Sequence, residues 1–238
     1  MNILITGGAS GLGKVISTQL AQNTSNHLLI TYKDSFDAAM DLANGYENIS
    51  TIRCDFNRRE DIQTLFEKML AFDVDVLINN AISSMQNNHF HKIARDSFIG
   101  SYISNVLPTL ELAQQAIKIF RKKKFGKIIT ILSSYLVNRP PIGLSEYVAN
   151  KSYLLSMSKS WAVENANFNI TSNCISPSIM KTGLTKNIDD RVVEGIIENH
   201  PLHELITPDE VCKAVKFILE SRHANGINIV LNMAENVI

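Results

Sequence analysis

The sequence predicts an α/β protein in which seven strands form one doubly wound parallel sheet, with helices on both faces in a three-layer αβα arrangement. Short runs rich in valine and isoleucine alternate with longer amphipathic runs along all 238 residues. A glycine-rich turn joins the first strand run to the first helical run. This alternation favours parallel strands because each helix carries the chain back to the same edge of the sheet.

The predicted strands are short apolar runs bounded by turn residues or charges. They are Asn2 to Thr6, His27 to Tyr32, Ile49 to Cys54, Val74 to Asn79, Lys127 to Ser133, Ile170 to Ser176 and Ile227 to Leu231. The predicted helices lie between them and carry apolar residues at helical spacing. They are Leu12 to Gln22, Ser35 to Asn44, Arg58 to Phe72, Phe98 to Lys123, Ser145 to Phe168 and Pro208 to Glu220.

No repeat, low-complexity tract or Pro/Gly/Ser-rich linker divides the chain, so residues 1–238 are predicted to form a single domain. The segment from Ile179 to His203 is longer than an ordinary connection. Its mixture of charged and apolar residues predicts a helical substrate flap around residues 179–203. Ligands of such sheets bind at the carboxyl ends of the strands, where the strand order reverses, and we expect the functional motifs there.

The charge balance argues against large anionic partners, because Lys plus Arg and Asp plus Glu both number 23. Three isolated cysteines favour reduced thiols in a cytoplasm over a disulfide framework. The first residues run directly into a strand, and no apolar run approaches the roughly 20 residues of a membrane-spanning helix. Two histidine pairs, at 89/91 and 200/203, lack a third ligand. We expect a cytoplasmic protein without a metal, nucleic-acid or membrane partner.

The turn from Thr6 to Gly13 predicts a dinucleotide site. Its glycines permit a tight turn and close approach of the backbone to a pyrophosphate, while the following helix offers free N–H groups. A plain turn is the alternative interpretation, and the order of strand, turn and helix argues against it. The residues expected at the coenzyme are Gly7, Ser10, Gly11, Leu12 and Gly13.

The end of the second strand should meet the adenosine ribose. Tyr32 stands where an acid would bind a ribose diol, and Lys33 follows with a charge that could neutralise a 2′-phosphate. NADP(H) is therefore favoured, with NAD(H) possible. Asp34 would serve NAD if the strand ran one or two residues longer, and Ser10 adds no second cation.

Tyr147 and Lys151 lie four residues apart on a predicted helix, so both side chains project from one face. A nearby ammonium favours the phenolate of a tyrosine, which can then exchange a proton with a substrate. Ser134 is placed at the end of the fifth strand, thirteen residues before Tyr147, where its hydroxyl could bind the substrate oxygen. A Tyr-x-x-x-Lys pair alone could be accidental. Asn105, in the preceding helix, is either a structural amide or the holder of a water that relays protons to Lys151.

These residues resemble the short-chain dehydrogenases/reductases, in the single-domain branch similar to 3-oxoacyl-carrier-protein reductases. The resemblance covers nearly the whole chain, and it includes the glycine spacing from Thr6 to Gly13. Asp55 matches an adenine-contacting acid, and Asn79-Asn80-Ala81 matches the Asn-Asn-Ala motif of the family. The segment from Asn173 to Thr182, with Met180, resembles the part that contacts the nicotinamide. The four catalytic positions correspond to Asn105, Ser134, Tyr147 and Lys151.

The resemblance implies a Rossmann-like fold, a homodimer or homotetramer, and defined roles. Tyr147 would be the acid/base, and Lys151 would bind the nicotinamide ribose and lower the pKa of the tyrosine. Ser134 would position the carbonyl, and Asn105 would support the relay. Ile82 and Ser178 replace glycines usual in the family, and these changes weigh against fatty-acid synthesis as the role.

The function expected from the sequence is reduction of a ketone, or oxidation of a secondary alcohol, with NAD(P)(H). The substrate is a small carbonyl or alcohol compound, possibly carrier-bound, such as an acyl chain, a polyketide or a deoxysugar. The residues expected around it are Tyr135, Leu136, Leu144, Met180 and Leu184, with Asn138, Arg139 and Ser145 nearby. The alternative is a sensor or scaffold that binds the dinucleotide without catalysis, although such a protein has no need of an acid/base pair.

Overall fold

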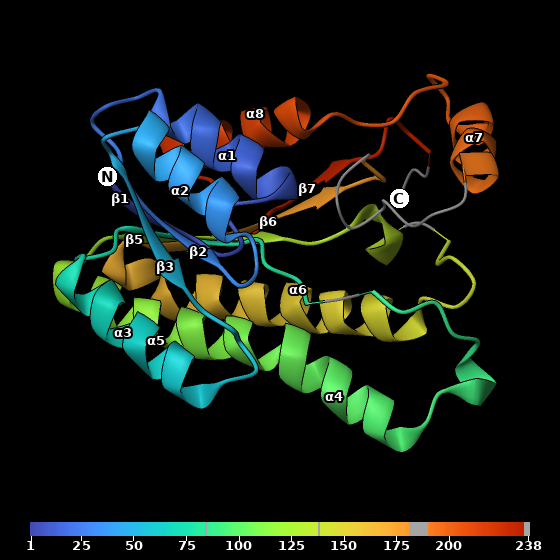
Figure 1. Ribbon diagram of the computed structural model, residues 1–238, viewed down its shortest axis with the longest axis horizontal. Coiled ribbons are helices and arrows are strands. Elements are labelled where there is room, and N and C mark those ends of the chain that lie inside the picture. The colour runs from blue at the N-terminus through green and yellow to red at the C-terminus, as the bar shows by residue number, and fades with distance from the viewer. Residues whose placement is uncertain (84, 138, 181–189, 236–238) are drawn as a thin grey trace.

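The computed structural model describes residues 1–83, 85–137, 139–180 and 190–235 (Figure 1). Seven parallel strands form one sheet in the order β3-β2-β1-β4-β5-β6-β7. Their bounds are β1 Asn2–Ile5, β2 His27–Tyr32, β3 Ile49–Arg53, β4 Val76–Asn79, β5 Gly126–Ile131, β6 Ile170–Pro177 and β7 Asn228–Leu231. The predicted fold class, a doubly wound α/β protein with a seven-stranded parallel sheet, is confirmed.

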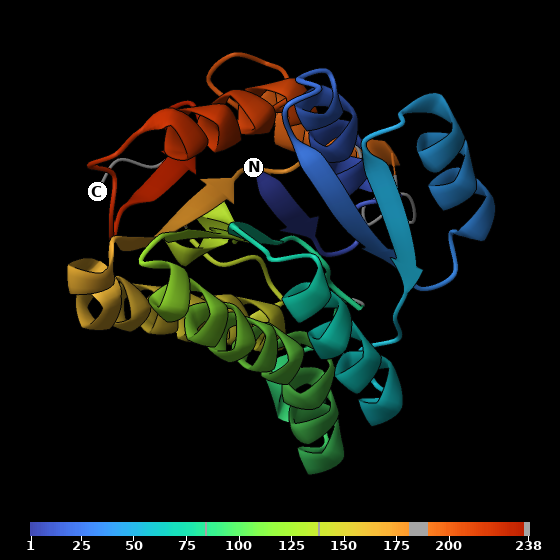
Figure 2. The ribbon, with the colours of Figure 1, turned by 90° about the vertical axis from the view of Figure 1, so that its left-hand side faces the viewer.

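Helices cover both faces of the sheet. Their bounds are α1 Gly11–Ala21, α2 Phe36–Gly45, α3 Arg59–Ala71, α4 Arg95–Asn105, α5 Leu107–Lys123, α6 Ser145–Asn165, α7 Asp190–Asn199 and α8 Pro208–Glu220. Three short 3-10 helices are η1 Phe90–Lys92, η2 Ser134–Leu136 and η3 Ala166–Phe168. Figure 2 shows α1, α2 and α8 on one face of the sheet and α3, α5 and α6 on the other.

The strands alternate their side chains between two cores. Ile3 and Ile5 of β1 pack on the side of α1 and α8, whereas Leu4 packs on the opposite side with Phe120 of α5 and Trp161 of α6. All three β1 side chains are fully buried. Because helices cover both faces of the sheet, the side chains on both faces of a strand are buried. This explains why the strand runs are continuously apolar rather than alternating with polar residues.

The strand order reverses between β1 and β4. Ile3 pairs with Leu28 of β2 on one side and with Val76 of β4 on the other, so the crossovers that leave β1 and β4 pass to opposite faces. A crevice opens outside the carboxyl ends of strands at such a reversal. The glycine turn, Lys33, Asp55, Ala81 and Met180 follow the ends of β1, β2, β3, β4 and β6 at this edge.

The helix predicted from Phe98 to Lys123 is interrupted. It begins earlier, at Arg95, and breaks between α4 and α5, where Val106 has φ −104° and ψ −55°. Pro108 lacks an N–H group and cannot donate to the carbonyl of Ser104 four residues earlier. Of the flap predicted for residues 179–203, α7 is helical as expected, and residues 181–189 lie outside the described residues. No described helix is both long and apolar enough to cross a membrane.

Candidate active site

The glycine turn after β1 is held by backbone geometry. Gly7 and Gly11 have φ of +63° and +50°, which an L side chain rarely adopts. The N–H of Gly7 donates to Oγ1 of Thr31, and the N–H of Gly8 donates to its carbonyl, at 3.0 Å each. The turn is therefore fixed to the end of β2, and its two left-handed positions favour glycine.

The N-terminus of α1 suits an anion. Ser10 is the N-cap residue, and its side chain makes no capping bond. The first-turn N–H groups of a helix have no intrahelical acceptor, and no acidic residue occupies this turn. A pyrophosphate placed here would accept hydrogen bonds from the backbone and meet the positive end of the helix dipole.

The Asn-Asn-Ala segment joins the glycine turn to β4. Oγ1 of Thr6 accepts from the N–H groups of Asn80 and Ala81 at 2.9 Å each, and Nδ2 of Asn80 donates to the Thr6 carbonyl at 2.9 Å. Asn79 is different, because it is only 5% exposed and its amide donates to Oγ1 of Thr130 on β5. Asn79 therefore braces two strands, and Asn80 and Ala81 face the crevice.

A cleft of about 920 Å³ follows the carboxyl ends of the strands from β3 to β6. The expected coenzyme residues that line it are Gly7, Ser10, Gly11, Leu12, Lys33, Asp55, Ala81, Tyr147, Lys151 and Met180. Gly13 and Asn79 are not among its lining residues, and Thr182 lies outside the described residues. A Cβ on Gly13 would stand 2.1 Å from the carbonyl oxygen of Gly7, so this glycine permits the helix to pack against the turn. The glycine turn lies near the middle of the cleft. The cleft extends far enough on both sides of this turn to fit a dinucleotide.

The end of the cleft near β2 and β3 carries an ion pair. Nζ of Lys33 lies 3.2 Å from Oδ2 of Asp55. The N–H of Asn57 and the Lys33 ammonium hold the pKa of the Asp55 carboxyl below its ordinary value. β2 ends at Tyr32 as predicted, so the longer strand that would favour an NAD role for Asp34 is not observed.

Tyr147 and Lys151 meet at the other end of the cleft, one turn apart on α6. Nζ of Lys151 lies 5.9 Å from the centre of the Tyr147 ring and donates to the carbonyl of Ile131 at 2.8 Å. Burial lowers the pKa of Lys151 to about 8. Burial also raises the pKa of Tyr147, and a hydrogen bond with the hydroxyl of Ser133 opposes that rise. The predicted pair therefore faces the cleft together.

The serine that lines the cleft beside Tyr147 is Ser133, and the expected Ser134 is not among the lining residues. β5 ends at Ile131, and the extended Ser133 precedes η2, so its side chain reaches the cleft. Ser134 is fully buried inside η2, does not line the cleft, and its hydroxyl has no hydrogen-bond partner. Ser133 lies fourteen residues before Tyr147, so counting thirteen residues back does not reach it.

Asn105 lies at the break between α4 and α5, and its side chain is fully engaged. Oδ1 accepts from both the N–H and the hydroxyl of Ser83, at 2.9 and 3.0 Å, and Nδ2 donates to the Ser101 carbonyl at 3.1 Å. The amide thus ties the segment after β4 to α4. Asn105 lines the cleft together with Ser104, Tyr147 and Lys151.

The substrate end is formed by Tyr135, Leu144 and Met180, which line the cleft together with Ile196 of α7. Leu136 instead packs against the buried side chains near Val106 and Leu132. Arg139 and Ser145 are not among the lining residues, and Asn138 and Leu184 lie outside the described residues. Burial raises the pKa of Tyr135, and the nearby Glu235 adds to the rise. Glu235 also accepts from the Ser178 hydroxyl at 3.1 Å. The sequence analysis did not identify the side-chain carboxylate of Glu235 as lying near the site.

Comparisons with known proteins agree with this geometry. A family model described as short chain dehydrogenase matches residues 1–192. The 3-oxoacyl-(acyl-carrier-protein) reductase FabG of Rickettsia felis is 29% identical over 239 residues, which cover 96% of this chain and 94% of that protein. The protein of the same name from Buchnera aphidicola is 30% identical over 251 residues, covering 94% and 95%. Carbonyl reductase family member 4 of Xenopus tropicalis is 27% identical over 231 residues, covering 96% and 94%. Because the family model spans well over half of the sequence, the chain belongs to the short-chain dehydrogenase family.

Proposed function

We propose that this chain is an NADP(H)-dependent oxidoreductase that reduces a ketone, or oxidises the corresponding secondary alcohol, with Tyr147 as acid/base. The observation that carries the proposal is the phenol of Tyr147, flanked by the Ser133 hydroxyl and the half-buried Lys151 at one end of the cleft. A proton donor, a hydrogen-bond donor for the carbonyl oxygen and a cation are the three groups that this reaction needs.

The nicotinamide, when bound, supplies or accepts the hydride. The residues of this chain handle the proton and the oxygen. In reduction the hydroxyl of Ser133 holds the carbonyl oxygen, and Tyr147 donates its phenolic proton to that oxygen as negative charge develops there. The Lys151 ammonium stabilises the resulting phenolate. By family resemblance it also binds the nicotinamide ribose. Asn105 keeps the segment around Ser83 in place beside them.

NADP(H) is the proposed coenzyme. Lys33 directly follows the end of β2 on the wall of the cleft, and half of its side chain is exposed, so it can turn from Asp55 to a 2′-phosphate. Tyr32 occupies the position at which a carboxylate would bind a ribose diol and repel a phosphate. NAD(H) remains the competing coenzyme in the test below.

The proposed substrate is a ketone with an apolar substituent. Leu144, Met180 and Ile196 provide an apolar wall beside the reacting groups, and Tyr135 adds a hydroxyl. The FabG relatives are named for 3-oxoacyl groups on a carrier protein, and the Xenopus relative is named a carbonyl reductase. A carrier-bound acyl ketone is therefore included among the candidate substrates, along with free ketones.

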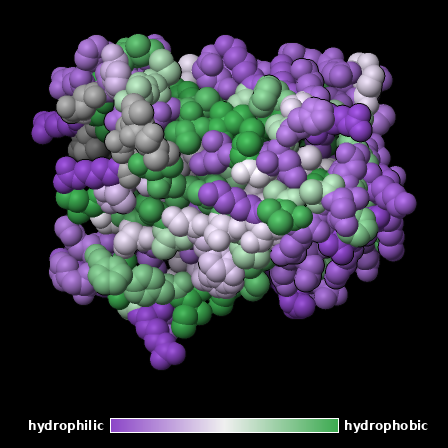
Figure 3. Space-filling view, turned by 180° about the vertical axis from the view of Figure 1, so that it is seen from behind, coloured by the Kyte–Doolittle hydropathy of each residue, from purple (hydrophilic) through white to green (hydrophobic). Residues whose placement is uncertain are grey.

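A homotetramer is the proposed assembly, because two separate apolar faces remain uncovered. On α4 no side chain is buried, and Phe98, Ile99 and Ile103 are between 38% and 46% exposed. Phe217 of α8 and Ile227 beside β7 are exposed on the second face. Figure 3 looks onto the β7 edge of the sheet and shows apolar side chains gathered there. Two isologous interfaces of this kind generate a tetramer with three perpendicular twofold axes.

The chain is further proposed to be one domain in the cytoplasm, with residues 179–203 as a substrate flap. All seven strands belong to one sheet, and Ile196 of α7 lines the cleft. The cysteines Cys54, Cys174 and Cys212 are unpaired and buried, which suits a reducing compartment.

The deciding experiment measures loss of reduced-nicotinamide absorbance with a panel of free and carrier-bound ketones, each offered NADPH and NADH. We expect turnover of at least one ketone, faster with NADPH. If the coenzyme binds but no ketone or alcohol in the panel reacts, the chain is a dinucleotide-binding sensor or scaffold. A higher kcat/KM with NADH would retain the reaction and overturn the coenzyme assignment.

A further inference from the structure

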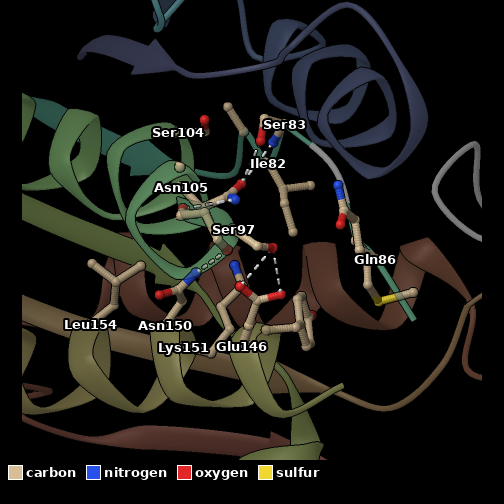
Figure 4. Close-up of a pocket in the computed structure, with 15 residues that line it drawn as sticks. Ile82, Ser83, Gln86, Ser97, Ser104, Asn105, Glu146, Asn150, Lys151 and Leu154 are labelled. Carbon is tan, nitrogen blue, oxygen red and sulfur yellow. Dashed lines mark hydrogen bonds between the residues drawn. The ribbon is translucent and has the colours of Figure 1, made fainter. Parts of the chain in front are cut away.

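A second, smaller cavity of about 200 Å³ lies behind the catalytic pair, between α4, α6 and the segment that follows β4 (Figure 4). It shares Asn105, Tyr147 and Lys151 with the coenzyme cleft, so the two spaces adjoin at the reacting groups. Its remaining polar lining comes from Ser83, Gln86, Ser97, Ser101, Ser104, Glu146 and Asn150. Because a water molecule occupies about 30 Å³, a polar cavity of this size has room for several.

The side chains on one side of α6 form two rows, and the two rows border different spaces. Tyr147 and Lys151 form one row and border both spaces. Glu146, Asn150 and Leu154, spaced four residues apart, form the adjacent row and border only the smaller cavity. The helix therefore presents a carboxylate on the face next to its catalytic pair.

The carboxylate of Glu146 has fewer hydrogen-bond donors around it than it can accept from. Its side chain is 8% exposed, and its two oxygens lie 3.1 and 3.3 Å from the same donor, Oγ of Ser97. An ionised carboxylate has about four acceptor sites, and one hydroxyl hydrogen cannot fill them. No Lys, Arg or His nitrogen in the described part of the chain lies within 4.0 Å of it. Figure 4 shows this carboxylate beside Ser97 in the cavity.

Burying a carboxylate without a cation is costly, and a neutral residue would fill the space at lower cost. Ser101 and Ser104 of α4 and Asn150 of α6 add neutral polar groups to the same lining. Polar groups thus line the cavity from Glu146 to Lys151. This arrangement favours proton movement over a packing role for the carboxylate.

We propose that Glu146 exchanges protons between solvent and Tyr147, acting through water in this cavity and through Lys151. The proposal rests on the proposed function. In each reduction the O–H bond of Tyr147 breaks and the O–H bond of the product alcohol forms. The phenolate then regains a proton along the cavity, because the Glu146 carboxylate takes up a proton from solvent and passes it on through the water to Tyr147. In oxidation the same proton travels outward.

The test compares Glu146→Gln and Glu146→Asp with wild type, using NADPH and a ketone that the wild-type enzyme reduces. Gln can still accept from Ser97 but cannot carry a proton. We expect kcat of Glu146→Gln to fall on the order of tenfold, with a larger solvent deuterium isotope effect on kcat and an unchanged Kd for NADPH. Glu146→Asp should retain most of kcat. The control is Glu164→Gln, an exposed carboxylate at the far end of α6, which should behave as wild type.

Chemical rescue separates proton transfer from a structural role. In Glu146→Ala, which enlarges the cavity, added formate should restore part of kcat because this small acid can enter and carry the proton. A kcat and isotope effect of Glu146→Gln equal to wild type would overturn the proposal while leaving the function intact. A loss that neither Asp nor formate restores would also overturn it, as structural damage. Failure of the wild-type enzyme to reduce any ketone would overturn the function and this inference together.

Discussion

The hydroxyl of Ser133 lies beside the phenol of Tyr147 at the end of the coenzyme cleft, and this polar contact opposes the rise that burial causes in the pKa of Tyr147. A ketone oxygen bound between these two groups would meet a donor on each side, one of which transfers its proton. Replacing Ser133 by Ala removes the positioning donor from a buried site. We expect kcat/KM for ketone reduction to fall about 100-fold, as it does when one donor to a developing oxyanion is lost.

Ser134→Ala is the matched control for that variant. The Ser134 hydroxyl is fully buried and lacks a hydrogen-bond partner, so its removal deletes an unsatisfied polar group. Activity should stay at the wild-type level, and the free energy of unfolding should stay the same or rise by about 1 kcal/mol. Steady-state kinetics and urea unfolding of both variants decide between the serines. Loss of activity in Ser134→Ala, with Ser133→Ala unaffected, would restore the assignment based on the thirteen-residue spacing.

Tyr147→Phe tests the acid/base itself. The variant keeps the ring above which Nζ of Lys151 lies, but it removes the proton that moves to the substrate. We expect kcat to fall by about 10² to 10⁴, the usual contribution of a general acid, while the Kd for NADPH remains near wild type. Fluorescence titration of NADPH measures binding separately from turnover. Undiminished kcat would exclude Tyr147 as the proton donor.

The local order of strand, turn and helix was predictable because it rests on short-range chemistry. The glycine turn, the end of β2 at Tyr32 and the Tyr147–Lys151 spacing all depend on residues close in sequence. The choice between Ser133 and Ser134 depended on where β5 ends and how the loop reaches α6, which spacing alone does not determine. The orientation of the Asn79 side chain was not predictable for a similar reason, since its partner Thr130 lies on another strand.

The break between α4 and α5 and the smaller cavity were also beyond the sequence prediction. Apolar residues recur at helical spacing from Phe98 to Lys123, which predicts one continuous helix. This pattern hides the helix break caused by Pro108, which cannot donate a hydrogen bond to the Ser104 carbonyl. From the sequence, Glu146 is an ordinary acidic residue in the first turn of α6, where a negative charge is favourable beside the helix N-terminus. Its burial beside Ser97 appears only when α4 packs against α6.

The pH dependence of reduction should follow Lys151. Its pKa in the folded protein is about 8, below the ordinary value for lysine, because burial disfavours the charged form. The ammonium is therefore present below pH 8 and is lost as the pH rises through that value. We expect kcat/KM for reduction to be level below about pH 8 and to fall tenfold per pH unit above it.

Lys151→Arg provides the control for this assignment, because guanidinium stays protonated throughout the range. The variant will have lower activity, since Arg does not reproduce the bond to the Ile131 carbonyl, but the decline above pH 8 should vanish from its profile. Persistence of the same decline in Lys151→Arg would assign it to another group.

Coenzyme choice should depend on Lys33. Lys33→Ala removes the cation at the end of β2 and leaves the remaining cleft unchanged. We expect kcat/KM with NADPH to fall about tenfold, because a charge-assisted contact to a phosphate contributes roughly 1.5 to 3 kcal/mol when well formed and less when solvent-exposed. The value with NADH serves as the internal control and should change little. Equal losses with both coenzymes would mean that Lys33 acts through Asp55 rather than on the 2′-phosphate.

The proposed tetramer predicts that one charge on each apolar face separates it into dimers. Ile103→Arg places a cation on the exposed face of α4, and Phe217→Arg does the same on α8, where each would have to be buried without a partner in an isologous interface. Light scattering after size-exclusion chromatography should give the mass of a dimer for each single variant and of a monomer for the double variant. Leu70→Arg, on an equally exposed leucine of α3, should remain a tetramer. A tetramer that survives both substitutions would show that other surfaces hold it together, and a monomeric wild type would refute the assembly itself.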